Sequence, residues 1–265
     1  MKKIGFIGAG NMGGALCLAA SKTDCILYVF DPDTAKAQAL CDKTGAILSE
    51  RDALCATCDL IYLGVKPQML ATVAAELSPA LASRSTPYCL VSMCAGVTTA
   101  RLGELFPGAA VIRIMPNTPV AVGQGMIQYC HNAQATKEQV DTFLYAMQHA
   151  GKVDLLDEGL FDAATAVSGC GPAFAYLFAN ALAKGGADCG LPYETAAEYA
   201  AQMLLGAALM LQNDPRTPEE LRIAVCSPGG STIEGVKVMW AQGLEDTVRD
   251  AVKASFERNK QLGKS

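Results

Sequence analysis

The chain predicts an α/β protein in which a doubly wound, mostly parallel sheet is followed by an all-helical domain. A glycine-rich turn joins the first apolar strand to a helix, apolar strands and helices then alternate up to residue 155, and no strand-like segment follows residue 158. Such alternation is typical of parallel sheets whose ligands lie across the carboxyl ends of the strands. We therefore expect a sheet domain over residues 1–157 and a helical domain over residues 158–265.

The opening turn runs Gly8-Ala9-Gly10-Asn11-Met12-Gly13 and follows an apolar strand over residues 4–7. In a phosphate-binding turn, Gly8 makes the tight bend, Gly10 lets phosphate oxygens approach the backbone, and Gly13 lets the helix pack closely on the strand. The N–H groups at the start of the helix then face the pyrophosphate. Taken alone, this pattern is weak, because a glycine turn can simply join a strand to a helix.

The sequence after the turn strengthens the interpretation. A second apolar strand over residues 25–30 ends on Asp31, at about the distance from Gly13 that is typical of a ribose-binding carboxylate. Together, the turn, the strand and the acid predict a dinucleotide-binding domain of the Rossmann type.

The remaining elements of the first half follow the same alternation. Strands are expected over residues 59–63, 88–92, 110–114, 125–130 and 151–155, and helices over residues 34–43, 67–77 and 137–150. A short helix is also expected to end near Cys55 and Cys58. Asp33 is placed to cap the helix that follows it, and Pro67 lies in the first turn of another.

The second half is expected to be entirely helical. A helix over residues 193–212 carries apolar residues on nearly every face, which is typical of a helix that is buried all round. A helical domain of this size has little interior for such a helix, so we expect a second subunit to cover it. The alternative is a helix at the centre of its own domain.

Composition narrows the function classes. Hydrophobic residues make up 51% of the chain and charged residues 18%, which is typical of a well-packed globular protein. The formal net charge of -5 argues against a nucleic-acid-binding surface. We expect no membrane-spanning segment, no signal peptide ahead of the first strand, and a cytoplasmic location.

The eleven cysteines are expected to be reduced thiols that pack as small apolar side chains. Cys55 and Cys58 form a CxxC pair, but no second pair and no nearby histidine pair completes a zinc site. We therefore expect no metal site.

Polar loops follow three of the predicted strands, at the edge where a cofactor would lie. Val65, Lys66 and Pro67 follow the strand over residues 59–63, and Lys66 can reach a phosphate or ribose, although a lysine there is as often an exposed surface residue. Ala95 follows the strand over residues 88–92, in a loop that could pass close to a nicotinamide.

A third loop, Met115-Pro116-Asn117-Thr118-Pro119, follows the strand over residues 110–114. Its two prolines stiffen a segment that bears one amide and one hydroxyl, as a site that orients a ring would require.

Two loops in the helical half place small residues and hydroxyls just before a helix: residues 168–173 and residues 226–232. The second brings consecutive N–H groups and two hydroxyls to a helix start, where a carboxylate can bind. Either loop alone could simply cap a helix. Together with the sheet domain, they predict that the sheet binds the cofactor and the helices bind an acid substrate.

These motifs resemble those of pyrroline-5-carboxylate reductases. In order, they are Ile7-Gly-Ala-Gly-Asn-Met12, Val65-Lys-Pro-Gln68, Met115-Pro-Asn-Thr-Pro119, Ser168-Gly-Cys-Gly-Pro-Ala173 and Ser227-Pro-Gly-Gly-Ser-Thr-Ile233. The resemblance covers nearly the whole chain, and the last motif is the most specific. It implies reduction of 1-pyrroline-5-carboxylate to L-proline by NADPH or NADH, the final step of proline synthesis. It also implies a homodimer with interlocking helical domains, and in many cases a ring of dimers.

The resemblance also implies roles for individual residues. Those expected to bind the cofactor are Gly8, Ala9, Gly10, Asn11, Met12, Gly13, Asp31, Val65, Lys66, Pro67, Ala95, Asn117 and Glu158. Those expected to bind the substrate are Ser227, Gly230, Ser231 and Thr232, of which Thr232 is the catalytic residue whose hydroxyl approaches the ring nitrogen. Two positions depart from the family, because Cys170 replaces the usual serine and Phe174 the common tyrosine.

The reaction requires few catalytic groups from the protein. A cyclic imine protonates readily and accepts hydride without a strong enzymic acid, so the protein mainly positions the reactants and excludes water. For the coenzyme, Asp31 favours the ribose diol of NADH, while Lys36 is a distant candidate for the 2′-phosphate of NADPH.

Two rival functions remain open at this point. A hydroxyacid dehydrogenase of the 6-phosphogluconate type would need a catalytic lysine shortly after Gly169-Cys170-Gly171, and none follows there. A regulatory protein that binds a dinucleotide without turnover is harder to exclude, although it would not need a substrate loop at residues 227–232.

Overall fold

The computed structural model describes residues 1–262 and divides the chain into two compact units. Among the described residues, the first unit comprises Met1–Cys170 and residues 255–262, and the second comprises Gly171–Ala254.

The first unit is built on one eight-stranded sheet with the order β3-β2-β1-β4-β5-β6-β7-β8. The strands are β1 (Lys3–Ile7), β2 (Ile26–Phe30), β3 (Ile47–Leu48), β4 (Leu60–Leu63), β5 (Cys89–Ser92), β6 (Ala110–Pro116), β7 (Gly125–His131) and β8 (Gly151–Leu155). Every neighbouring pair is parallel except β6 and β7. The predicted fold class is thus confirmed. The two-residue edge strand β3 and a short helix over Thr99–Leu105 were not predicted.

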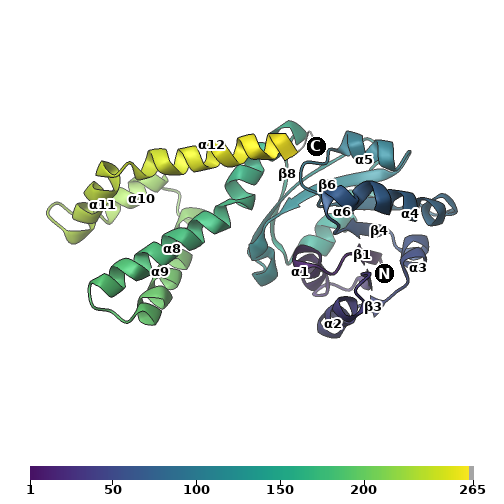
Figure 1. Cartoon of the computed structure of the whole chain (residues 1–265), viewed down its shortest axis with the longest axis horizontal. Helices are drawn as coiled ribbons and strands as arrows, with labels where there is room; N and C mark the ends of the chain where they lie inside the picture. Colours follow the sequence, from purple (N-terminus) through teal and green to yellow (C-terminus); the bar gives the residue numbers. More distant parts are fainter. Residues whose placement is uncertain (263–265) are drawn as a thin grey trace. The chain divides into compact units, whose positions relative to one another are not determined.

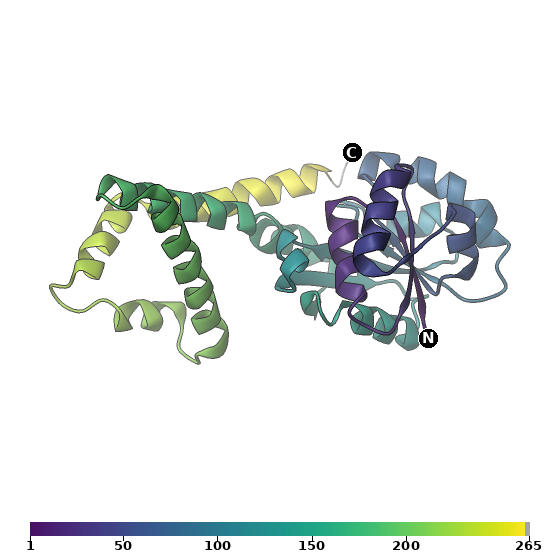
Figure 2. The same ribbon diagram turned by 90° about the horizontal axis from the view of Figure 1, so that it is seen from below.

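Helices cover both faces of this sheet (Figures 1 and 2). They are α1 (Asn11–Ala20), α2 (Thr34–Thr44), α3 (Arg51–Thr57), α4 (Leu70–Ala82), α5 (Thr99–Leu105) and α6 (Lys137–Met147). On β4, Leu60 and Tyr62 belong to the core that α1, α2 and α6 cover, whereas Ile61 and Leu63 belong to the core that α3, α4 and α5 cover. Burial on both faces explains why the strands read as continuous apolar runs.

The strand order reverses between β1 and β4. From β1 the chain moves outward to β2 and β3, and it then returns to the other side of β1 to form β4. In such sheets a crevice opens at the carboxyl ends of the two strands at this point, and ligands bind there. The glycine turn directly follows β1, so it lies at the reversal.

Local signals set several helix boundaries, and the sequence predicted one of them, the Asp33 cap. The helix expected over residues 67–77 instead begins at Leu70 and ends at Ala82. The Asp33 side chain accepts a hydrogen bond from the Lys36 N–H at 3.2 Å and caps α2, which ends at Gly45 with φ of 70°. Thr136 and Gln139 form a reciprocal capping box at the start of α6.

After β8 the described chain is helical to its end, as predicted. A 3-10 turn, η3 (Glu158–Leu160), leads into α7 (Phe161–Ala164) and a π-helical turn, η4 (Thr165–Gly169). The second unit follows with α8 (Gly171–Asp188), α9 (Tyr193–Asn213), α10 (Pro218–Ala224), α11 (Ser231–Ala241) and the first part of α12 (Leu244–Leu262).

The apolar surface of α9 is not buried within the described chain. Only Ala196 and Ala200 of this helix are buried, whereas Met203, Leu205 and Leu209 are 46%, 52% and 49% exposed. A helix at the centre of its own domain would bury these side chains, so this alternative is wrong. The exposed apolar residues leave a large surface for a second subunit.

The expectation that no segment could span a membrane needs correction. The 31-residue helical stretch Glu158–Asp188 contains an 18-residue window with a mean hydropathy of 1.3, so it is long and apolar enough to cross a membrane by length and composition alone. Within this stretch, α8 buries only Ala183 among its described residues.

The core offers a first test of stability. Tyr62 is fully buried and stacks on Phe6 with ring centroids 4.6 Å apart, but its hydroxyl has no hydrogen-bond partner among the described residues. Burial raises the pKa of Tyr62 well above its usual value. Because an unsatisfied buried hydroxyl is costly, we expect Tyr62→Phe to raise the free energy of unfolding by about 1 kcal/mol in urea denaturation. A loss of stability would show that the hydroxyl has a partner in solution.

Candidate functional site

The glycine turn is shaped by contacts that only glycine permits. Gly8 has φ of 108°, and a Cβ there would lie 2.4 Å from the carbonyl oxygen of Gly64, at the end of β4. Its N–H donates to the Phe30 carbonyl at 2.8 Å, so the turn is tied to β2 as well. A Cβ at Gly13 would lie 2.3 Å from the Gly8 carbonyl oxygen, which lets α1 pack directly on the turn.

Gly10 has the opposite environment. No atom lies within 4 Å of the position that its Cβ would occupy, and the residue is exposed. It is the N-cap of α1 and makes no side-chain cap. The turn is therefore tight beneath Gly8 and open above Gly10, so the residues present fit a dinucleotide pyrophosphate at the start of α1.

Asp31 anchors the turn from the end of β2. One carboxylate oxygen accepts the N–H of Ala9 at 2.7 Å, and the other accepts the N–H of Asp33 at 2.8 Å. Each carboxylate oxygen has a second lone pair, so both can still accept ribose hydroxyls. The sequence predicted a ribose ligand but did not reveal this bond to the turn.

The loops after β4 and β5 are joined by a sulfur contact. The Cys94 thiol, which is buried, donates to the Val65 carbonyl at 3.3 Å. Lys66 is exposed, and Pro67 begins a 3-10 turn, η1 (Pro67–Met69), ahead of α4. The loops that carry Val65 and Ala95 are thus held together at the carboxyl edge of the sheet.

Asn117 is engaged at both ends of its amide. Its Nδ2 donates to the Ser168 carbonyl at 2.9 Å, and its Oδ1 accepts the N–H of Met126 at 2.9 Å. The side chain therefore links the loop after β6 to β7 and to the π-helical turn η4. The sequence suggested an amide that orients a ring, but it did not show that protein groups already bind this amide.

The turn η4 has a second support, which sequence reasoning missed. Gln128 on β7 is 4% exposed, and its Nε2 donates to the Ser168 hydroxyl at 2.9 Å. The hydroxyl also donates to the Ala164 carbonyl at 2.9 Å. π-Helical turns are often found at functional sites, and the Ser168-Gly-Cys-Gly motif was the available signal for this one.

Glu158 lies in a network that joins three elements. Its carboxylate accepts the N–H and the hydroxyl of Thr99 at 2.7 Å each and one N–H of Arg113 at 2.9 Å. Burial alone would raise the pKa of this carboxyl, but the hydrogen bonds from Arg113 and Thr99 outweigh burial and lower it. Glu158 is therefore an ionised carboxylate at the start of α5.

The loop ahead of α11 begins that helix without a side-chain cap. Gly230 is the N-cap residue, Gly229 has φ of 72°, and the Gly230 N–H donates to the Ser227 carbonyl at 3.0 Å. Ser231 and Thr232 form the first turn and are both exposed. The positive end of the helix and two hydroxyls are therefore accessible to an anion.

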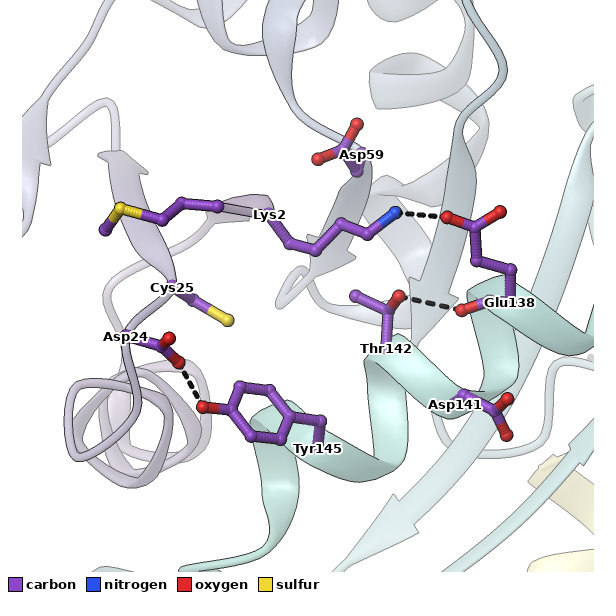
Figure 3. Close-up of a pocket in the computed structure, with 9 residues that line it drawn as sticks. Lys2, Asp24, Cys25, Asp59, Glu138, Asp141, Thr142 and Tyr145 are labelled. Atoms are coloured by element: carbon purple, nitrogen blue, oxygen red, sulfur yellow. Dashed lines mark hydrogen bonds and ion pairs between the residues drawn. The ribbon is translucent and has the colours of Figure 1, made fainter.

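A hollow of about 670 Å³ lies at the amino ends of the strands (Figure 3). Its polar groups bind one another: Lys2 Nζ lies 2.6 Å from a carboxylate oxygen of Glu138, and the Tyr145 hydroxyl bonds to Asp24. No cluster of potential metal ligands occurs anywhere in residues 1–262. The hollow lies at the opposite edge from the glycine turn, and we do not include it in the candidate active site.

The fold and the glycine turn define a dinucleotide-binding protein of the Rossmann class. Residues 3–96 match the family model described as NADP oxidoreductase coenzyme F420-dependent, and residues 158–262 match the one described as pyrroline-5-carboxylate reductase dimerisation.

Individual relatives agree over the full length. The chain is 34% identical to pyrroline-5-carboxylate reductase of Escherichia coli strain K12, covering 100% of this chain and 99% of that protein. It is 36% identical to that of Synechocystis, covering 99% and 98%. The solved structure of the Coxiella burnetii reductase has a TM-score of 0.90 at 29% identity, covering 99% and 98%. That of a Plasmodium falciparum pyrroline carboxylate reductase with NADP bound has a TM-score of 0.87 at 29% identity, covering 99% and 98%. The chain belongs to the pyrroline-5-carboxylate reductase family.

A pair of glycine variants tests the turn. Gly8→Ala would place a Cβ against the Gly64 carbonyl, so we expect the dissociation constant for NADPH, measured by isothermal titration calorimetry, to rise by about tenfold or more. Gly45 is the control, because it also has positive φ but has open space around its Cβ position. Gly45→Ala should cost about 1–2 kcal/mol of stability and leave NADPH binding unchanged. Equal NADPH affinity in both variants would contradict this role of Gly8.

Proposed function

We propose that this protein is a pyrroline-5-carboxylate reductase, which reduces 1-pyrroline-5-carboxylate to L-proline with NADPH or NADH in the last step of proline biosynthesis. The observation that carries the proposal is the match over the full length of the chain, which includes both the glycine turn and the dimerisation region. Retention of the residue 227–232 loop supports a catalytic protein over a regulatory one. A hydroxyacid dehydrogenase is disfavoured because the chain has no lysine after Gly171-Pro172 in the position such enzymes use.

The cofactor is proposed to lie over the carboxyl edge of the sheet. The turn from Gly8 to Gly13 would hold the pyrophosphate at the start of α1, and Asp31 would accept the ribose hydroxyls. The other residues proposed for this site are Val65, Lys66, Pro67, Ala95, Asn117 and Glu158. Their hydrogen bonds suggest two groups: Lys66 is exposed and can reach a phosphate, whereas Asn117 and Glu158 already bind protein groups and would position the site.

The substrate carboxylate is proposed to bind at the start of α11, against Gly230, Ser231 and Thr232, with Ser227 nearby. An anion at this point gains hydrogen bonds from backbone N–H groups and from the positive end of the helix. This site supplies orientation without a charged side chain, which suits a small acid that must also be released as product.

The mechanism follows from the chemistry of a cyclic imine. When bound, the reduced nicotinamide supplies a hydride to the imine carbon. The protein orients the ring through its carboxylate, excludes water, and places the Thr232 hydroxyl at the ring nitrogen. The imine nitrogen is protonated before the transfer and keeps that proton in the product amine, so no strongly acidic side chain is required.

The assembly is proposed to be a homodimer through the helical domain, with a higher ring of dimers as a further step. The exposed apolar residues of α9 and the dimerisation match over residues 158–262 support the dimer. We also propose a domain boundary between residues 157 and 158. The start of the dimerisation match at residue 158 supports it. We further propose that the protein is soluble and cytoplasmic.

The role of Thr232 gives a direct test. Thr232→Ala removes the hydrogen bond to the ring nitrogen, so we expect kcat to fall by about tenfold to a hundredfold while the NADPH dissociation constant is unchanged. Thr232→Ser keeps the hydroxyl and should retain most of the activity. The assay follows NADPH consumption with 1-pyrroline-5-carboxylate. Full activity of Thr232→Ala would contradict this role, and a wild-type protein that binds NADPH without turnover would favour the regulatory alternative.

Coenzyme choice gives a second test. Asp31 should bind the ribose diol of NADH and repel a 2′-phosphate, so we expect kcat/KM with NADH to be at least as high as with NADPH. Asp31→Asn removes the repulsion and should shift the ratio of the two kcat/KM values toward NADPH. A large preference of the wild-type protein for NADPH would show that another residue decides the choice.

A further inference from the structure

Arg113 is a charged side chain inside the sheet unit. It lies on β6, is 6% exposed, and its guanidinium lies over the Phe161 ring at 4.5 Å from the centroid. A buried guanidinium is costly unless it is paired and hydrogen-bonded. Its ion-pair partner is Glu158, at 2.9 Å. The pair therefore explains why the chain can keep an arginine in the interior.

Glu158 also binds the first residue of α5. Its two carboxylate oxygens bind the N–H and the hydroxyl of Thr99, the first residue of that helix. Oε1 is shared, since it accepts from both Thr99 and Arg113. A carboxylate that binds both donors of one residue holds the backbone at that residue in position and orientation.

Thr99 lies two residues after the turn from Cys94 to Val97 that carries Ala95. The turn is closed by the Val97 N–H, which donates to the Cys94 carbonyl at 3.3 Å, and Gly96 has φ of 76°. Its other end is held by the Cys94 thiol on the Val65 carbonyl. The turn is thus fixed at both ends, by Cys94 on one side and by Glu158 on the other.

We propose that Arg113 and Glu158 are positioning residues for the coenzyme: together they hold the start of α5, and with it the Ala95 turn, in the place needed to receive the nicotinamide. The inference rests on the proposed function and deepens it. It assigns a task to Arg113, which the sequence did not single out, and changes the expected task of Glu158 from direct contact to positioning.

The arrangement requires an ionised Glu158. A carboxyl protonated at Oε2 can no longer accept the Thr99 hydroxyl there, and it lacks the negative charge that pairs with the buried Arg113. The other titratable or charged groups near the carboxylate are Arg113 on β6, Cys130 on β7 and Asp157 at the start of η3. Burial raises the pKa of Cys130 to about 12, so this thiol does not ionise near neutral pH.

The sign of the pH effect follows. Because the pKa of Glu158 is lowered in the folded protein, its contribution is present above the ordinary carboxyl pKa and is lost as the pH falls through the lowered value. Removing Arg113 takes away one of the groups that lower the pKa of Glu158, while burial and the Thr99 hydrogen bonds remain, so this pKa should be higher than in the wild-type protein. The contribution of Glu158 would then disappear at a higher pH than in the wild-type protein.

The test uses three substitutions in the full-length protein. Glu158→Gln keeps the shape of the side chain and removes its charge, Thr99→Val removes only the hydroxyl, and Arg113→Met removes the buried cation. Glu138→Gln is the matched control, because it breaks the ion pair with Lys2 at the opposite edge of the sheet. Each variant is measured for KM and kcat with NADPH, for the pH profile of kcat/KM, and for thermal unfolding.

We expect Glu158→Gln to raise the KM for NADPH by about tenfold with a smaller change in kcat, and Thr99→Val to raise it by about threefold. The acid limb of kcat/KM should move to higher pH in Arg113→Met and should be absent in Glu158→Gln. The control should match the wild-type protein in all kinetic measurements.

Opposite outcomes overturn the proposal. They are a wild-type KM and pH profile in folded Glu158→Gln and Thr99→Val, or a loss of thermal stability in these two variants without any change in KM. If Arg113→Met does not fold, these two variants still decide. If the wild-type protein shows no turnover, the proposed function fails separately, and NADPH dissociation constants from calorimetry then test the positioning role in the same variants.

Discussion

The arrangement of loops at the carboxyl edge of the sheet depends on one contact, between the backbones of Gly8 and Gly64. It brings the turn after β1 against the end of β4, at the point where the strand order reverses. A Cβ at Gly8 would lie 2.4 Å from the Gly64 carbonyl oxygen, so a side chain there would force the two loops to shift. The turn is thus tight beneath Gly8, whereas Gly10 is open and leaves the N–H groups at the start of α1 available for a phosphate.

Around this contact, polar side chains hold the loops by binding one another. Asp31 holds the turn, Asn117 holds the π-helical turn η4, and Glu158 holds the start of α5. Such bonds are strong when they are shielded from water and cost binding energy if they must form only when the ligand arrives. A site built in this way is preorganised before the ligand binds. This suits a reaction that depends on positioning the reactants and excluding water more than on a general acid or base.

The helical unit differs from the sheet unit because most of its large apolar side chains are exposed. Its helices expose large apolar side chains along α8 and α9, while its own interior buries only a few alanines among the described residues. In a single chain these apolar side chains remain exposed to water. Burying them, which would be favourable, requires the surface of a partner. The dimerisation match and the loop ahead of α11 thus lie in the same part of the sequence.

The sequence by itself determined the order of strands and helices, the glycine turn, the acid after β2 and the family, because apolar periodicity and the conformational needs of glycine are local properties. It missed β3, whose two exposed residues carry no periodic signal, and it missed the seven-residue helix α5. Only the tertiary structure decided that Asn117 binds Ser168, that Gln128 supports the same turn, and that Arg113 pairs with Glu158, 45 residues away. These choices depend on which side chains the packed sheet brings within hydrogen-bonding distance, and spacing along the chain does not encode that distance.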